Sequence, residues 1–263
     1  MTGYDELLGG GYASQRRPDP RIAAQIRQAL GDARSVVNVG AGAGSYEPAD
    51  LAVVAVEPSE VMRAQRPPGA APCVAAGAED LPFADGQFDA AMAVLTVHHW
   101  GDWRAGCAEL RRVAGRCVVL TWDPAVAQSF WLVAEYVPGL LDSDRRRFPA
   151  TLADQMQALG ATHAEPVLVP DDCTDGFLGA HWRAPERYLD PSVRRGMSVF
   201  AKTSADHVAA GLGRLEQDVR SGAWADRHRD LLELTELDLG YRLLVSEVAD
   251  RDAPGADIAP GAS

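Results

Sequence analysis

Residues 36–44 have the sequence Val36-Val37-Asn38-Val39-Gly40-Ala41-Gly42-Ala43-Gly44, in which a β-branched run passes directly into three glycines at alternate positions. Such a run is typical of a buried strand. Glycine is needed where the backbone takes a positive φ or where a Cβ would collide with a bound molecule. A second apolar segment, residues 51–56, ends in Glu57-Pro58. The pattern predicts two strands of one sheet, with a ligand at the carboxyl end of the first and a carboxylate at the end of the second.

The carboxylate of Glu57 could take both hydroxyls of a ribose, so the pattern indicates a cofactor that contains a nucleoside. Two cofactors fit it: a dinucleotide such as NAD, and S-adenosylmethionine (SAM). A dinucleotide needs the N-terminus of a helix for its pyrophosphate. Only residues 45–50, which include Pro48, separate the third glycine from the next strand, and they hold one helical turn at most. The spacing therefore favours SAM over NAD, and a glycine-rich turn that binds no ligand is the third alternative.

The composition of the chain limits its other functions. Its 263 residues are enough for one large α/β domain with an additional subdomain. The formal net charge of -12 argues against DNA or RNA as a partner, because phosphate contacts need clustered Lys and Arg. The N-terminus lacks the pattern of a signal peptide and no run of 18 apolar residues exists, so we expect a cytoplasmic protein without membrane contact. The four cysteines lie far apart and indicate neither a disulfide framework nor a metal site.

Strand and helix patterns alternate along the chain. The helical spacing of Ile22, Ile26 and Leu30 predicts a helix before the first strand. Alternation of this kind is typical of a doubly wound α/β sheet that is parallel at its centre. We expect strands at 35–39, 51–57, 72–76, 88–95, 116–122, 164–169 and 241–248, and helices at 22–30, 59–65, 103–113, 126–137, 149–159 and within 191–238.

Four segments together resemble the class I SAM-dependent methyltransferases. They are the glycine segment 36–44, the acid-tipped segment 53–59, the segment Ala78-Glu79-Asp80-Leu81-Pro82-Phe83-Ala84-Asp85-Gly86-Gln87-Phe88-Asp89, and Val97-His98-His99-Trp100. Within that family the chain is similar to the small-molecule branch that includes enzymes of ubiquinone and menaquinone biosynthesis. The resemblance covers about residues 35–125.

The resemblance implies a Rossmann-like, seven-stranded fold with a helical cap inserted before the last strand. The expected parts are an N-terminal lid and helix at 1–34, a SAM-binding core at 35–170, a helical substrate cap at 171–240, the last core strand at 241–249 and a disordered tail at 250–263. We expect a monomer or a homodimer that acts on a small-molecule acceptor.

The resemblance also implies roles for single residues. The glycine loop would hold the methionyl part of SAM, Glu57 the ribose, and Met62 the adenine. An arginine of the N-terminal lid could pair with the SAM carboxylate. The expected cofactor contacts are Gly40, Ala41, Gly42, Gly44, Tyr46, Glu57, Pro58, Met62, Ala78, Glu79, Ala93, Val94, Tyr12 and Arg17. Asn38 departs from the family, which usually has an acid at that position, and so does Gly77.

Two histidines directly after the fourth strand are the candidate catalytic residues. His98 or His99 could remove the proton of a hydroxyl acceptor, and the rate would then rise with pH through the ordinary histidine range. For other acceptors, positioning and exclusion of water could carry the reaction. The expected acceptor contacts are Trp100, Trp122, Trp131 and Trp182, whose density indicates an apolar or aromatic acceptor. Each of these side chains could instead serve core packing alone.

The sequence therefore predicts a methyltransferase that uses SAM, with the acceptor atom, O, N or C, left open. Two other functions fit the same residues. One is a SAM-fold protein that transfers no methyl group, such as a cyclase or a binding module. The other is an NAD-dependent oxidoreductase, which would have to hold a dinucleotide without a helix after the glycine loop.

Overall fold

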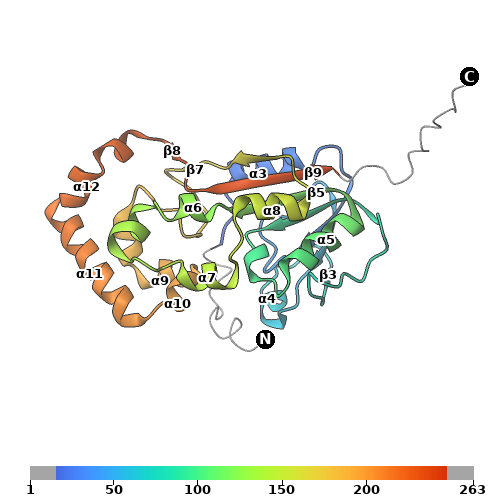
Figure 1. The fold of residues 1–263 in the computed structure, drawn as a ribbon, viewed down its shortest axis with the longest axis horizontal. Helices are drawn as coiled ribbons and strands as arrows, with labels where there is room; N and C mark the ends of the chain where they lie inside the picture. Colours follow the sequence, from blue (N-terminus) through green and yellow to red (C-terminus); the bar gives the residue numbers. More distant parts are fainter. Residues whose placement is uncertain (1–15, 248–263) are drawn as a thin grey trace, which may run out of the picture.

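A seven-stranded sheet forms the centre of the computed structural model, which describes residues 16–247 (Figure 1). Its strand order is β3-β2-β1-β4-β5-β9-β6, and β9 runs antiparallel to both of its neighbours while the other pairs are parallel. This arrangement confirms the expected doubly wound sheet. The strands are β1 (Ser35–Val39), β2 (Ala52–Val56), β3 (Cys73–Val74), β4 (Phe88–Val94), β5 (Ala114–Trp122), β6 (His163–Pro166) and β9 (Tyr241–Glu247).

Alternate side chains of the central strands pack into cores on opposite faces of the sheet, because successive strand residues point to opposite sides. Val36 belongs to the core beneath the helix α3 (Pro20–Ala29). Val37 and Val39 belong to the other core, which α5 (Trp103–Val113) and α8 (Leu152–Leu159) cover. The short helix α4 (Glu60–Ala64) follows β2. Helices thus flank both faces of the sheet, while the strand ends stay available for a site.

The connection between β1 and β2 forms turns and contains no helix within residues 40–51, all of which the structure describes. The spacing of Gly44, Pro48 and the second strand predicted this. The loop is held by backbone bonds, since the N–H groups of Gly40 and Ala41 both donate to the carbonyl of Val56, at 2.9 and 3.0 Å. These bonds place the glycine loop directly beside the end of β2.

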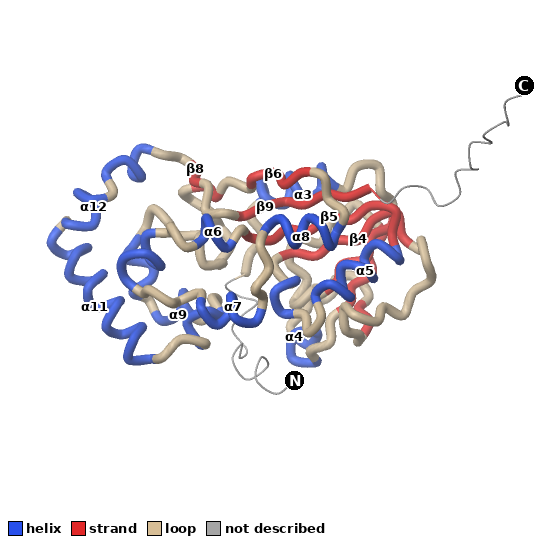
Figure 2. The backbone as a smooth tube through the Cα atoms, viewed as in Figure 1, coloured by secondary structure: helices blue, strands red, loops and turns tan. Residues whose placement is uncertain are grey.

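The helices between β5 and β9 other than α8 form a second lobe, and Figure 2 shows them gathered on one side of the strands. The two-stranded sheet of β7 (Val169–Pro170) and β8 (Glu236–Leu237) closes the base of the segment 171–240, which we call the cap. In Figure 1, α11 and α12 lie at the end of the lobe remote from the sheet. The lobe contains α6 (Pro124–Ala127), η2 (Leu132–Tyr136), α7 (Asp142–Arg147), η3 (Pro185–Leu189), α9 (Pro191–Arg194), α10 (Ser198–Ala201), α11 (Ala205–Ser221), α12 (Ala223–Arg227) and η4 (Arg229–Glu233).

Two expected elements differ in the structure. The single helix predicted at 126–137 is split into α6 and the π-helix η2, and between them the hydroxyl of Ser129 donates to the carbonyl of Val126. The strand predicted at 164–169 is divided between β6 and β7, which belong to different sheets. Apolar residues continue on both sides of the first break, so the sequence does not mark it. Pro166 stands at the end of β6 and marks the second break, because proline has no backbone N–H to donate to a neighbouring strand.

Part of the predicted organisation lies outside the described residues. This holds for residues 1–15 of the expected lid, with Tyr12, and for the expected tail at 250–263. Within residues 16–247, no helix combines the length and apolarity that crossing a bilayer requires.

Candidate functional site

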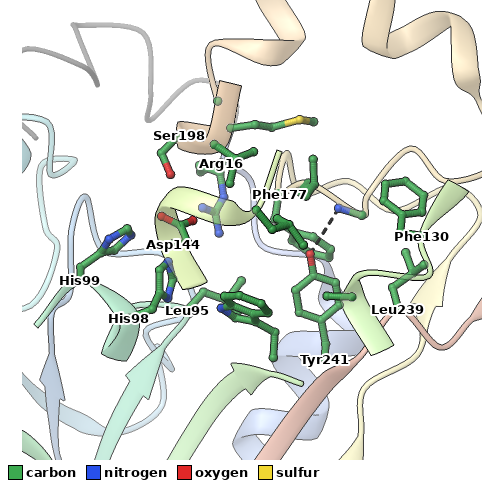
Figure 3. Close-up of a pocket in the computed structure, with 18 residues that line it drawn as sticks. Arg16, Leu95, His98, His99, Phe130, Asp144, Phe177, Ser198, Leu239 and Tyr241 are labelled. Carbon is green, nitrogen blue, oxygen red and sulfur yellow. Dashed lines mark hydrogen bonds between the residues drawn. The ribbon is translucent and has the colours of Figure 1, made fainter. Parts of the chain in front are cut away.

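Two adjoining cavities lie at the carboxyl ends of the central strands. The large cavity has a volume of about 610 Å³ and is lined by the loop after β1, the end of β2 and the residues that follow β4. The small cavity, of about 110 Å³, lies between the end of β5 and the cap (Figure 3). Arg16, Leu95 and His99 line both. A molecule in one cavity would therefore meet a molecule in the other at these three residues.

The glycine loop forms one wall of the large cavity. Gly40 has φ +70°, and a Cβ at this position would lie 2.2 Å from the Thr96 hydroxyl oxygen. Gly42 has φ +53°, and a Cβ there would lie 3.3 Å from the end of the Met62 side chain. Both positions thus combine a left-handed backbone with a close neighbour, which is why glycine stands at each. Ala41 lines the same wall.

Glu57 stands at the end of β2 and is buried, with 7% of its surface exposed. Its two carboxylate oxygens accept backbone hydrogen bonds from Gly42 at 2.8 Å and from Ser59 at 2.9 Å. The structure therefore holds an oriented carboxylate in the wall of the large cavity, next to the glycine loop.

Pro58, Met62, Ala78, Glu79 and the segment 99–101 also line the large cavity. The Glu79 carboxylate accepts from the backbone N–H groups of Gly101, at 2.8 Å, and Asp102, at 3.1 Å. This side chain thus fixes the loop before α5, whereas the sequence suggested a contact with adenine. Glu79 can fix the loop before α5 and also contact a ligand, since its carboxylate binds the loop while the residue borders the large cavity.

Trp100 borders the large cavity and does not line the small one among the residues that the structure describes. Its ring packs on Gly106 of α5, where a Cβ would lie 2.4 Å from a ring carbon. The sequence suggested Trp100 as an acceptor contact, and the structure places it in the lining of the large cavity. Val94 also lines the large cavity, whereas Ala93 is fully buried in the core.

The two candidate histidines lie in the 3-10 turn η1 (Val97–His99), with ring centroids 3.9 Å apart. His98 lines the small cavity and meets the ring of Trp122 edge-on at 6.1 Å. Burial lowers the pKa of His98 to about 4. Burial, followed by the neighbouring His98, also lowers the pKa of His99 well below its ordinary value. Both rings are therefore neutral at neutral pH and can accept a proton.

The walls of the small cavity are mainly apolar and aromatic. Leu95, Trp122, Phe130, Phe177 and Met197 contribute to them, and Trp122 is one of the residues that the sequence suggested as an acceptor contact. Figure 3 shows His98, His99, Asp144 and Arg16 together on one side of this cavity, while the hydroxyl of Tyr241 lies apart from them. Such a site fits an apolar molecule that carries one polar group.

An ion pair that local sequence does not indicate lies at the junction of the two cavities. The Lys202 ammonium donates to the Asp144 carboxylate at 2.7 Å, and both side chains are less than a tenth exposed, at 8% and 6%. Asp144 lines the small cavity and Lys202 the large one. The two residues are 58 positions apart in the sequence, so only the tertiary fold brings them together.

Arg16, and not Arg17, is the N-terminal arginine that reaches the site. The Nε of Arg16 donates to the carboxylate of Asp175 at 2.7 Å, and its side chain borders both cavities. Arg17 is exposed and does not line either cavity within the described part of the chain. The sequence offers two adjacent arginines in an irregular segment, where no periodicity shows which one points inward.

Tyr46 and Gly44 lie in the glycine loop but do not line either cavity, as far as residues 16–247 define the walls. Tyr46 has a positive φ of 65° and is buried. Its hydroxyl donates to the carboxylate of Asp175 at 2.8 Å. Tyr46 therefore connects the loop to the cap, which is a structural role that the expected cofactor contact did not anticipate.

Trp131 and Trp182 also stay away from both cavities, judged on the described residues. The indole N–H of Trp131 donates to the carbonyl of Trp182 at 2.8 Å, and the indole N–H of Trp182 donates to the carbonyl of Val169 at 2.9 Å. Trp131 is 4% exposed and Trp182 is completely buried. Both are core residues of the second lobe, and we omit them from the acceptor site.

Comparison with known proteins places this geometry in context. Residues 37–117 match the family model described as methyltransferase domain. A crystal structure from Anabaena variabilis, of a protein described as a methyltransferase from an antibiotic biosynthesis pathway, is 35% identical with a TM-score of 0.81. That match covers 88% of this chain and 98% of that chain. No curated protein matches the sequence significantly.

Two more distant structures share the fold. The YcgJ protein of Bacillus subtilis is 18% identical with a TM-score of 0.50, and the match covers 85% of this chain and 95% of that one. A protein of Bacillus halodurans described as a methyltransferase is 15% identical with a TM-score of 0.50, and the match covers 86% of this chain and 98% of that one.

Proposed function

Because the chain belongs to the class I SAM-dependent methyltransferases, we propose that it transfers the methyl group of SAM to a small apolar or aromatic acceptor. One observation carries this proposal. A large, partly polar cavity at the glycine loop adjoins a small, mainly apolar cavity, and Arg16, Leu95 and His99 line both. A methyl donor and an acceptor must meet in line, and the two cavities meet at one boundary.

The residues of the large cavity fit SAM. The Glu57 carboxylate is oriented for the ribose hydroxyls, and Met62 and Ala78 offer an apolar surface and a backbone donor for the adenine. The loop around Gly42 would hold the methionyl part. Arg16, a fixed cation at the boundary, would receive the carboxylate of SAM. When bound, SAM supplies a methyl group on a sulfonium, which a nucleophile can displace.

The small cavity would hold the acceptor. Its apolar walls exclude water, which favours reaction of the sulfonium methyl group with the positioned acceptor and limits hydrolysis. If the acceptor is a hydroxyl, His99 at the boundary of the two cavities is in place to take its proton, and His98 lies on the acceptor side. A carbon or amine acceptor would depend on positioning alone. The acceptor atom and the branch of the family remain predictions.

The shape of the cofactor side favours SAM over a dinucleotide. Within residues 40–51 no helix begins, so a pyrophosphate would find no helix N-terminus at the glycine loop. Calorimetry with S-adenosylhomocysteine and with NADH tests this point directly. Binding of NADH but not of S-adenosylhomocysteine would refute the proposed cofactor.

Transfer itself is tested with isotope-labelled SAM and a panel of phenols, amines and compounds with an activated carbon. We expect label in at least one apolar acceptor. Binding of S-adenosylhomocysteine without transfer to any member of a broad panel would instead support a SAM-fold protein that does not transfer methyl groups.

A further inference from the structure

Tyr241, the first residue of β9, contributes its phenol ring to the wall of the small cavity. The hydroxyl oxygen of Tyr241 accepts a hydrogen bond from the backbone N–H of Gly179 at 3.3 Å. Among residues 16–247, no acceptor receives the hydrogen of this hydroxyl. A phenol hydroxyl both accepts and donates, so its donor function is available to a bound molecule.

The sheet and the cap together fix the position of this phenol. Tyr241 pairs with Trp122 of the neighbouring strand β5, so both side chains stand on the same face of the sheet. The ring of Phe177, in the cap, meets the Tyr241 ring edge-on, with centroids 4.7 Å apart. The bond from Gly179 orients the hydroxyl from the same side. A donor held in this way can recognise one atom of a ligand.

The surroundings of the hydroxyl are apolar. Phe177, Leu178 and Leu239 line the small cavity together with Tyr241. Figure 3 shows the hydroxyl apart from the polar group that contains His98 and the other charged and imidazole side chains. Burial raises the pKa of the Tyr241 phenol, so the hydroxyl keeps its proton at neutral pH. The small cavity therefore has a second polar position, which offers a neutral hydrogen-bond donor.

We propose that the Tyr241 hydroxyl donates a hydrogen bond to an oxygen atom of the acceptor, and so selects apolar acceptors that carry a carbonyl or ether oxygen away from the methyl-accepting group. The methyl-accepting group must lie at the boundary of the two cavities, which His99 lines. Within residues 16–247, Tyr241 lines the small cavity and not the large one, so its hydroxyl meets a different part of the same molecule. Tyr241 is a specificity-determining contact and takes no part in the transfer. The inference rests on the proposed function.

Such a contact is selective because an unpaired buried polar group is costly. When a hydrocarbon of the same shape enters the cavity, the Tyr241 hydroxyl loses contact with water and gains no partner. A site that hydrogen-bonds its ligand rejects an analogue without the matching atom more strongly than an apolar pocket rejects a small change in size. An acceptor with the oxygen should therefore bind more tightly than its hydrocarbon analogue.

Two phenols of similar size test the contact. 4-Hydroxyacetophenone carries a carbonyl group opposite its hydroxyl, whereas 4-isopropylphenol has a hydrocarbon group there. Tyr241→Phe keeps the ring and removes the donor, so the carbonyl oxygen is left buried without a partner. Calorimetry with saturating S-adenosylhomocysteine should show a fall of about fivefold to a hundredfold in affinity for the ketone. The affinity for 4-isopropylphenol should stay within about twofold or rise.

Tyr136→Phe is the matched control. The Tyr136 hydroxyl donates to the Asp218 carboxylate at 2.8 Å, and Tyr136 lines neither of the two cavities in the described part of the chain. This variant should keep the parent's ratio of the two affinities. Tyr241→Phe also removes the acceptor of the Gly179 N–H, but a resulting shift of the cap affects both phenols, so the ratio of their affinities isolates the contact.

Infrared spectroscopy of the ketone with a ¹³C-labelled carbonyl gives a second measurement. A hydrogen bond weakens the C=O bond, so the carbonyl stretching frequency of the bound ketone should be lower in the parent than in Tyr241→Phe. It should also be lower in the parent than in an apolar solvent. The second comparison needs no variant, so it decides the question alone if thermal unfolding shows that Tyr241→Phe does not fold.

The outcomes separate this inference from the proposed function. A loss of affinity confined to the ketone, together with the frequency difference, supports the contact. If the parent binds S-adenosylhomocysteine but Tyr241→Phe changes both affinities equally or neither, the contact is overturned and the proposed methyl transfer is unaffected. The same holds if the parent binds neither phenol or leaves the carbonyl frequency as in an apolar solvent. A parent that does not bind S-adenosylhomocysteine refutes the proposed function, and this inference with it.

Discussion

Replacement of Glu57 by alanine is the most direct test of the cofactor site. The buried carboxylate accepts backbone hydrogen bonds from Gly42 and Ser59, and we propose that it also accepts the ribose hydroxyls. A hydrogen bond to a charged group contributes about 1.5–3 kcal/mol, so loss of the ribose contact alone predicts a fall of about tenfold to a hundredfold in affinity for S-adenosylhomocysteine. Release of the loop at Gly42 would add to this loss.

The control is Glu60→Ala, which removes the same charge three positions later. Glu60 is exposed and does not line either cavity within residues 16–247, so its variant should bind like the parent. Calorimetry gives the affinities, and adenosine compared with 2′,3′-dideoxyadenosine isolates the hydroxyl contact. The parent should prefer adenosine, and Glu57→Ala should lose most of that preference. A folded Glu57→Ala variant with the parent affinity and preference would remove Glu57 from the site.

Three further predictions follow from other contacts. Because the pKa of His98 is low, the rate of a histidine-dependent methylation of a hydroxyl should be constant from about pH 6 to 8, and a rate that rises through about pH 6.5 would contradict this environment. The free energy of unfolding should decrease as the pH falls from about 6.5 to about 4, because the unfolded state binds the proton more readily. Urea unfolding of Gly40→Ala should show a loss of unfolding free energy larger than the roughly 1–2 kcal/mol that a left-handed backbone costs a residue with a Cβ, because the new Cβ also meets Thr96. Adding Thr96→Ala should recover part of the loss, and equal stability of the single and double variants would show that Thr96 does not contribute to it. Lys202→Met should lower the free energy of unfolding by about 3–5 kcal/mol, because Asp144 is left buried without its cation. Adding Asp144→Asn should restore most of this free energy in the same urea unfolding measurement, and no recovery would mean that the ion pair is not the cause of the loss.

The sheet and the meeting of the glycine loop with Glu57 could be predicted because their signals are local. A β-branched run, a glycine segment and an acid at a strand end each occupy a few consecutive residues, and the parallel sheet brings the strand ends together. Glu57 and Gly42 therefore meet as the sequence indicates. The absence of a helix within residues 40–51 also follows from local spacing.

The lining of the small cavity could be predicted only in part, because its residues come from distant segments. Asp144 and Lys202 lie in unremarkable polar surroundings, and their buried pairing depends on how the cap packs. The number of tryptophans indicated aromatic walls, but Trp122 lines a cavity while Trp131 and Trp182 fill the core. Aromatic composition does not distinguish these roles, since both bury large apolar surfaces.

The buried carboxylate of Asp175 shows that the glycine loop and the cap are not independent. It accepts from the hydroxyl of Tyr46 in the loop and from Arg16 at the boundary of the two cavities. Burial raises the pKa of Tyr46, so its hydroxyl stays protonated and donates. The same hydroxyl accepts from the backbone N–H of Asp19, directly before α3, at 3.3 Å. Moving the cap at Asp175 would leave Arg16 and Tyr46 without this acceptor, so displacement of the cap here is costly. The geometry of the small cavity is therefore coupled to that of the glycine loop through one carboxylate.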